Sequence, residues 1–165
     1  MNEPTREQRM AAIEHVVFDY TYLLSAAHHT LFGAAPWRVH AEKALLLHYR
    51  NVDEFLLRDS RDGRILATDY LEPETARCWD LPTWRAEWRE HMRTHLDHLG
   101  YERLAERSWT PHKWVSILDG EARTAWKQFY DAITDQEYRQ EFVRQVEIRR
   151  RELVAFHVRV ELLYA

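Results

Sequence analysis

The sequence predicts an all-α fold, an antiparallel helical bundle of about five helices with one long connection at about residues 59–80. Apolar residues recur at helical spacing along most of the chain, and no stretch of useful length alternates apolar and polar residues as a strand would. The composition agrees, because 45% hydrophobic and 13% aromatic residues are typical of a globular protein with a large aromatic core. At 165 residues we expect a single helical-bundle domain, spanning residues 1–165.

The first helix is expected to begin at Thr5, which can form a capping box with Gln8, and to end at Phe32, before Gly33 and Pro36. A second helix is expected from about Pro36 to Arg58. The predicted core positions of these two helices are Met10, Ile13, Val17, Leu24 and Leu31, then Trp37, Ala41, Ala44, Leu45, Val52, Phe55 and Leu56. The following segment, residues 59–80, has turn signals and scattered apolar residues, so we expect a structured connection with room for a short helix.

A third helix is predicted from Pro82 to Gly100, with a short continuation to Arg107. Another begins at the Thr110-Pro111 pair and runs to Ile133. Thr134 and Glu137 fit a second capping box, which predicts a last helix running almost to the C-terminus. Within that helix the Arg-rich stretch 139–151 is interleaved with glutamates, which predicts a solvated face with ion pairs.

Charge and cysteine content indicate which partners and which cellular compartment to expect. The net charge of −4 argues against a general electrostatic attraction to nucleic acid, although a local basic patch is compatible with it. The one cysteine, Cys78, cannot form an intrachain disulfide, and no secretory leader is recognisable, so we expect a cytoplasmic protein. No window approaches 18 consecutive apolar residues, so no membrane span is expected.

Four histidines form a candidate metal site. His91, His95 and His98 lie on one side of the predicted third helix, and His48 lies near the centre of the second helix's apolar stripe. Imidazoles on facing bundle helices can converge on zinc or iron. The alternative is that His48 is a core histidine hydrogen-bonded to a neighbour while the other three line a groove or an interface, and no cofactor is then required.

Two stretches resemble an uncharacterised group of small bacterial proteins of similar length. They are the stretch from His48 to Leu56, which contains Arg50-Asn51 and later Phe-Leu, and the stretch from His95 to Arg103, which contains His-Leu and a downstream Arg. This resemblance covers residues 41 to about 115 and implies a helical fold without an established activity.

A looser resemblance is to HEPN domains, helical bundles that are commonly dimeric and include metal-independent ribonucleases of toxin and defence systems. Their motif is an Arg followed four to six residues later by a His, and Arg93 and His98 match it. The resemblance implies that His98 acts as acid or base on the RNA 2′-hydroxyl and leaving group while Arg93 stabilises the phosphate charge. Residues five apart on a helix point about 140° from each other, so convergence on one substrate requires a homodimer or a break near Gly100. Arg50 and Asn51 are the alternative phosphate contacts.

Three functions therefore compete. The first is a HEPN-like protein that cleaves or binds RNA, or binds a partner, through His98, Arg93, Arg50 and Asn51. The second is a non-catalytic helical interaction module, a homodimer in which the tryptophans and the histidine stripe form the surface. Exposure of Trp37, Trp79, Trp84 and Trp109 would favour this second function. The third is a bundle that binds zinc or iron through the four histidines. Whether the protein is an enzyme does not follow from the sequence.

Overall fold

The computed structural model describes residues 3–34, 37–57, 63–81 and 111–155. Across these ranges the chain is all-α, as predicted, with no strand. The elements are α1 (Arg6–Phe32), α2 (Trp37–Leu57), the 3₁₀ turn η1 (Ala67–Tyr70), α3 (Pro73–Arg77), α6 (Pro111–Ala132) and α7 (Gln136–Ala155). The helix predicted from Pro82 to Gly100, and its continuation to Arg107, lie outside the described residues.

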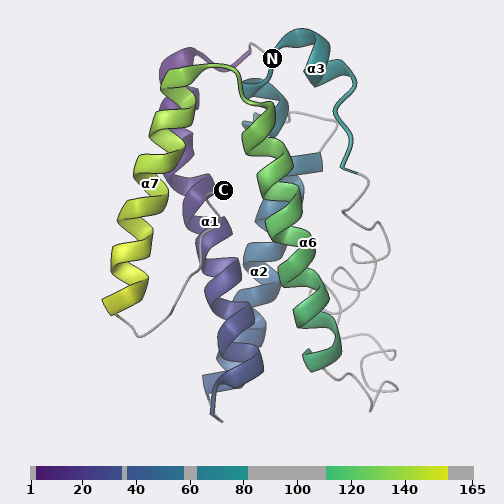
Figure 1. Ribbon diagram of the computed structural model, residues 1–165, viewed down its shortest axis with the longest axis vertical. Helices are drawn as coiled ribbons and strands as arrows, with labels where there is room; N and C mark the ends of the chain where they lie inside the picture. Colours follow the sequence, from purple (N-terminus) through teal and green to yellow (C-terminus); the bar gives the residue numbers. More distant parts are fainter. Residues whose placement is uncertain (1–2, 35–36, 58–62, 82–110, 156–165) are drawn as a thin grey trace.

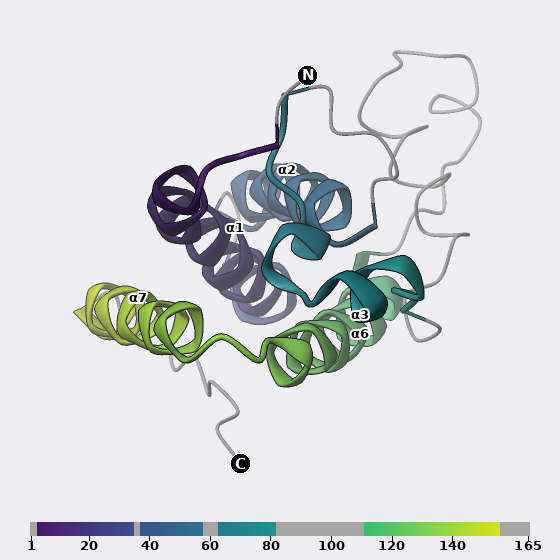
Figure 2. The same ribbon diagram turned by 90° about the horizontal axis from the view of Figure 1, so that it is seen from above.

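The long helices form a bundle in which α1 is central. Helix α1 packs against α2, α6 and α7. Helices α1 and α7 run in one direction, and α2 and α6 run in the opposite direction (Figure 1). Seen along the bundle, α1 lies between α7 and α2, and α3 lies at the same end of the molecule as the C-terminal end of α6 (Figure 2). Helices joined by short loops are therefore antiparallel, as predicted.

The start of α1 follows the predicted capping box. The Gln8 amide donates to Thr5 Oγ1 at 3.2 Å, and the Thr5 amide donates to Gln8 Oε1 at 2.8 Å. At the other end, the Gly33 amide donates to the His29 carbonyl at 2.8 Å, and a Cβ at position 33 would collide with that same carbonyl oxygen. The close approach of the backbone explains why glycine suits this helix end.

The start of α7 differs from the prediction. Asp135, rather than Thr134, caps this helix, because its Oδ1 accepts hydrogen bonds from the amides of Glu137 at 2.9 Å and Tyr138 at 3.2 Å. The Thr134 hydroxyl instead donates to Glu72 at 2.9 Å, which ties the α6–α7 turn to the residue before α3. Both residues are good N-caps, and this tertiary hydrogen bond separates their roles.

Buried aromatic rings from the long helices meet in one cluster. The Phe129 ring is fully buried and lies edge-on to Phe55, Trp126 and Phe142, with centroid distances of 5.1, 5.7 and 5.4 Å. Trp126 in turn stacks on Tyr20 of α1 at 4.0 Å. Edge-to-face and stacked aromatic pairs add to the burial energy of such rings, so this cluster joins α1, α2, α6 and α7.

The connection after α2 belongs to the core. Leu66, Ala67, Tyr70 and Leu71 are buried, and the Tyr70 ring packs against Tyr138 and Phe142 of α7. The Tyr70 hydroxyl donates to the Arg9 carbonyl at 2.8 Å. Burial, the largest cause, raises the pKa of Tyr70, so the phenol stays protonated and keeps its donor. The expected short helix is present as η1 and α3.

Most of the Arg-rich stretch of α7 forms the predicted ion pairs. Arg144 pairs with Glu141 at 2.6 Å, and Arg150 with Glu147 at 3.5 Å. Arg139 is an exception, because its guanidinium donates to the Ile133 carbonyl at 3.0 Å and lies over the Tyr130 ring. It thus satisfies a carbonyl at the C-terminal end of α6.

None of the helices in the described ranges combines the length and the apolar character needed to cross a bilayer.

Truncation of the central aromatic ring tests this core. We expect Phe129→Ala to lower the free energy of unfolding by about 3–5 kcal/mol, because it removes a fully buried ring and leaves a cavity. The matched control is Phe32→Ala, since Phe32 is 75% exposed and its loss should change stability by no more than about 0.5 kcal/mol. Urea denaturation followed by circular dichroism measures both, and equal effects would contradict the assigned core.

The capping carboxylate predicts a pH dependence. The hydrogen bond from Arg6, at 2.7 Å, is the main cause that holds the pKa of Asp135 below its usual value, and the two helix amides act in the same direction. A carboxylate whose pKa is lower in the folded state than in the unfolded state stabilises the fold at pH values above its unfolded-state pKa, near 3.9. This stabilisation is lost as the pH falls through the folded-state pKa. We therefore expect Asp135→Asn to show a shallower loss of stability on acidification below about pH 4 than the wild type. Thermal unfolding between pH 2 and 7 measures the slopes, and identical slopes would refute this role.

Candidate functional site

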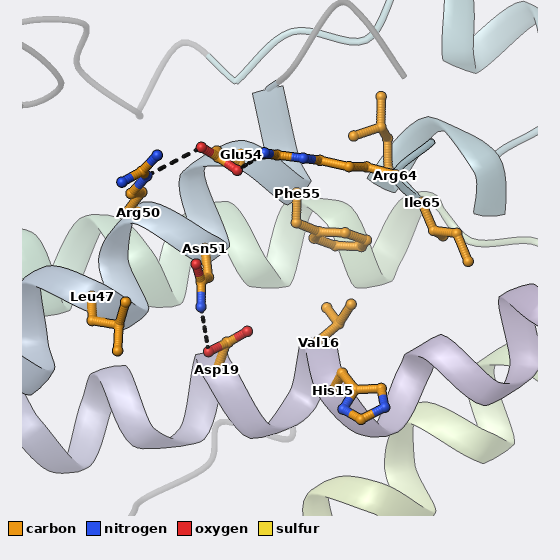
Figure 3. Close-up of a pocket in the computed structure, with 11 residues that line it drawn as sticks. His15, Val16, Asp19, Leu47, Arg50, Asn51, Glu54, Phe55, Arg64 and Ile65 are labelled. Atoms are coloured by element: carbon orange, nitrogen blue, oxygen red, sulfur yellow. Dashed lines mark hydrogen bonds and ion pairs between the residues drawn. The ribbon is translucent and has the colours of Figure 1, made fainter. Parts of the chain in front are cut away.

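A groove lies between α1, α2 and the segment that follows α2. Its volume is about 410 Å³, in the range of small-ligand sites. Figure 3 shows α1 along one side of it and α2 along the other. The lining residues are His15, Val16 and Asp19 of α1, Leu47, Arg50, Asn51, Glu54 and Phe55 of α2, and Arg64, Ile65 and Leu66.

One carboxylate connects the two helices at this groove. Asp19 Oδ1 lies 2.8 Å from His48 Nδ1 and 3.0 Å from Asn51 Nδ2. An ionised carboxylate only accepts hydrogen bonds, so both α2 side chains donate to it. A neutral His48 then carries its proton on Nδ1 and leaves Nε2 as the acceptor nitrogen.

His48 itself does not line the groove. His48 is 8% exposed. The centroid of its ring lies 5.6 Å from the ring centroids of both Phe18 and Tyr22. These two rings stack on each other with a centroid distance of 4.2 Å. The Arg149 guanidinium of α7 lies over the Phe18 ring, 5.4 Å from its centroid. The geometry is that of a core histidine hydrogen-bonded to a neighbour, one of the two alternatives that the sequence left open.

A row of alternating charges forms the other edge of the groove. Arg50 Nε donates to Glu54 Oε1 at 3.2 Å, and Arg64 Nη1 pairs with the second carboxylate oxygen, Glu54 Oε2. Figure 3 shows Glu54 between the two arginines. The side chains of Arg50 and Arg64 are 51% and 45% exposed, so two forked donors are held in place by one carboxylate while remaining accessible to solvent.

The structure therefore brings some of the predicted site residues together. Arg50 and Asn51 both line the groove. Arg93 and His98 lie outside the described residues, as do His91 and His95 of the candidate metal set. In the part of the chain that is described, no three His, Cys, Asp or Glu side chains are grouped closely enough to hold a metal ion.

The sequence did not single out three residues of the groove, Asp19, Glu54 and Arg64. Asp19 had a recognisable signal, because it is the only Asp, Glu, Lys or Arg between Glu14 and Arg38 in the sequence. A solitary charge in such an apolar helix has to find partners on another element. Glu54 and Arg64 carried no such signal, since each is one of many charged residues in a polar stretch.

Two tryptophans whose side chains are described, Trp79 and Trp126, pack into the core. The Trp79 indole donates to the Leu56 carbonyl at 2.9 Å, and the ring packs against Phe129. Trp126 is 8% exposed. The side chains of Trp37 and Trp114 and the residues Trp84, Trp88 and Trp109 are outside what is described.

Comparison of the chain with protein-family models, with curated proteins and with solved structures gives no match.

Removal of the shared carboxylate tests the network. We expect Asp19→Ala to lower the free energy of unfolding by about 1–3 kcal/mol, because it leaves the buried His48 donor and the Asn51 amide without their acceptor. The control is Asp119→Ala, which breaks a pair within one helix, Asp119 with Arg123 at 2.9 Å, and should cost no more than about 1 kcal/mol. The two carboxylates are similarly exposed, 22% and 28%. Equal losses in chemical denaturation would mean that Asp19 does not join α1 to α2.

Proposed function

We propose that this protein is a HEPN-like helical-bundle protein of the cytoplasm that binds single-stranded RNA at the groove between α1 and α2 and cleaves it without a metal ion, as a homodimer in a bacterial toxin or defence system. The observation that supports RNA binding is the pair of accessible guanidinium groups, from Arg50 and Arg64, at one edge of the groove. Arg50 belongs to a stretch that the sequence already singled out.

The energetics favour exchange of Glu54 for a phosphate. Exposed ion pairs such as Arg50 with Glu54 contribute roughly 0–1 kcal/mol. A charge-assisted hydrogen bond from a guanidinium to a phosphate contributes about 1.5–3 kcal/mol. Glu54 thus positions two arginines for a phosphate group and can be displaced by it at little cost. Because the net charge is −4, such binding depends on a local cationic site rather than on the charge of the whole protein.

Cleavage is assigned to His98 and Arg93. In this proposal His98 moves the proton of the 2′-hydroxyl or the leaving oxygen, and Arg93 stabilises the charge that develops on the phosphate. A symmetric dimer supplies the second copy of this pair. His48 has a positioning role, because its Nδ1 is engaged by Asp19 and its ring is buried outside the groove.

A non-catalytic interaction module is the alternative that one observation favours. Leu47 lines the groove and is 53% exposed, which is the kind of apolar contact that a protein partner or a second copy would bury. A zinc or iron site at His48, His91, His95 and His98 is the third proposal, and it predicts that chelation abolishes activity.

RNA cleavage in EDTA distinguishes these functions. We expect the wild type to cleave a mixed-sequence RNA in EDTA and His98→Ala to be at least about 100-fold slower, since general acid–base groups contribute roughly 10²–10⁴-fold. Gel electrophoresis of end-labelled RNA measures the rates, after circular dichroism shows that both proteins are equally folded. Loss of activity in EDTA would favour the metal site, and absence of both cleavage and binding would favour the interaction module.

RNA binding at the groove has a matched control on the same helix. We expect Arg50→Ala to weaken RNA binding about tenfold, because it removes one charge-assisted phosphate contact. Arg38→Ala should change it less than twofold, although Arg38 also pairs with a glutamate four residues on and is similarly exposed, at 43%. Fluorescence anisotropy of labelled RNA measures both, and equal effects of the two variants would place the RNA elsewhere.

A further inference from the structure

The two oxygens of the Asp19 carboxylate have different surroundings. Oδ1 accepts both hydrogen bonds from α2, those of His48 and Asn51. Among the described residues, no hydrogen bond reaches Oδ2. In Figure 3 the oxygen that does not face Asn51 is turned into the space beside Val16 and Phe55, which line the groove. Asp19 thus presents one acceptor oxygen to the groove.

This acceptor is held in a fixed position. Two donors on Oδ1 restrict rotation of the carboxylate, and the side chain is only 22% exposed. The ring of His48 is held in turn by the aromatic pair Phe18 and Tyr22. A polar group that is already oriented before the ligand arrives loses little conformational entropy on binding. It therefore discriminates well between ligands with and without a matching donor.

The groove therefore combines two requirements for its ligand. An ionised carboxylate repels phosphate oxygens and accepts only from a donor such as a hydroxyl group. The guanidinium groups of Arg50 and Arg64, at the α2 edge, attract an anion. A ribose with its 3′-phosphate meets both requirements, because the 2′-hydroxyl and the phosphate are attached to neighbouring carbons. Deoxyribose lacks the hydroxyl donor.

We propose that Asp19 is a specificity-determining residue that accepts a hydrogen bond from a ribose 2′-hydroxyl through Oδ2, so that the groove selects RNA over DNA. This inference rests on the proposed RNA-binding function and assigns a role that differs from cleavage. His48 and Asn51 act as positioning residues, because they orient the carboxylate without contacting the ribose.

The test uses one sequence in three backbones. A fluorescein-labelled single strand is prepared as RNA, as DNA and as 2′-O-methyl RNA, which keeps the 2′-oxygen and lacks its proton. The protein is the full chain with His98→Ala in EDTA, so that the RNA stays intact. We expect RNA to bind about tenfold more tightly than either of the other two strands, the size expected of one hydrogen bond to a charged group.

The variant Asp19→Asn then separates recognition from stability. Its Oδ1 can still accept from His48 and Asn51, which leaves an amide N–H₂ in place of the acceptor in the groove. We expect the preference of RNA over 2′-O-methyl RNA to fall from about tenfold to less than twofold. The control Asp119→Asn, outside the groove, should keep the full preference. If the role of Asp19 is purely structural, Asp19→Asn will weaken the binding of all three strands equally and leave the preference for RNA unchanged.

The outcomes are distinct. One outcome is that RNA and 2′-O-methyl RNA bind with equal affinity, and that RNA binding still depends on Arg50. This outcome would overturn the role of Asp19 and leave the proposed function standing. The same conclusion follows if Asp19→Asn is folded and keeps the preference. If the wild-type chain and the His98→Ala chain bind none of the three strands, both the inference and the proposed function fail. The comparison of strands on the unaltered Asp19 does not depend on the folding of any Asp19 variant.

Discussion

Helix α1 is covered on three sides, by α2, α6 and α7, and this arrangement constrains the rest of the molecule. A helix in that position has little surface left for charged side chains. Its sequence reflects this, because Asp19 is the only Asp, Glu, Lys or Arg between Glu14 and Arg38. That one carboxylate has to be satisfied inside the bundle, and two donors from α2 satisfy it.

The same constraint locates the groove. Because His48 and Asn51 reach toward Asp19, α2 approaches α1 at this level, and the next turn of α2 places Glu54 and Phe55 at the edge of the groove. The segment after α2 then adds Arg64 and Ile65. The chemistry of the groove is thus a consequence of how a partly buried charge is accommodated, with an acceptor on α1 and paired guanidinium groups on the opposite edge.

At one end of the bundle, polar contacts hold distant parts of the chain together. Arg6 at the start of α1 pairs with Asp135 and Glu137 at the start of α7, at 2.7 and 2.8 Å. The Tyr70 hydroxyl donates to the Arg9 carbonyl, and the Arg9 guanidinium donates to the Asp69 carbonyl. These contacts anchor η1 against α1 and α7. Arg64 and Ile65 lie a few residues before η1, so these contacts also help to position that edge of the groove.

The sequence by itself determined the fold class, the long helices that are described and most of their core positions. Helical periodicity and caps are local properties, so Thr5, Gln8 and the apolar stripe that contains Ile13 and Val17 could be recognised without tertiary contacts. Local pattern also placed Arg50 and Asn51 among the candidates. Only the tertiary structure decided that Asp135 caps α7, that His48 serves Asp19, and that Glu54 and Arg64 complete the groove. Each of these depends on a hydrogen bond or ion pair between side chains that local periodicity does not bring together. The packing of the helices decides which of several equivalent polar residues has a partner, and no local sequence pattern encodes that choice.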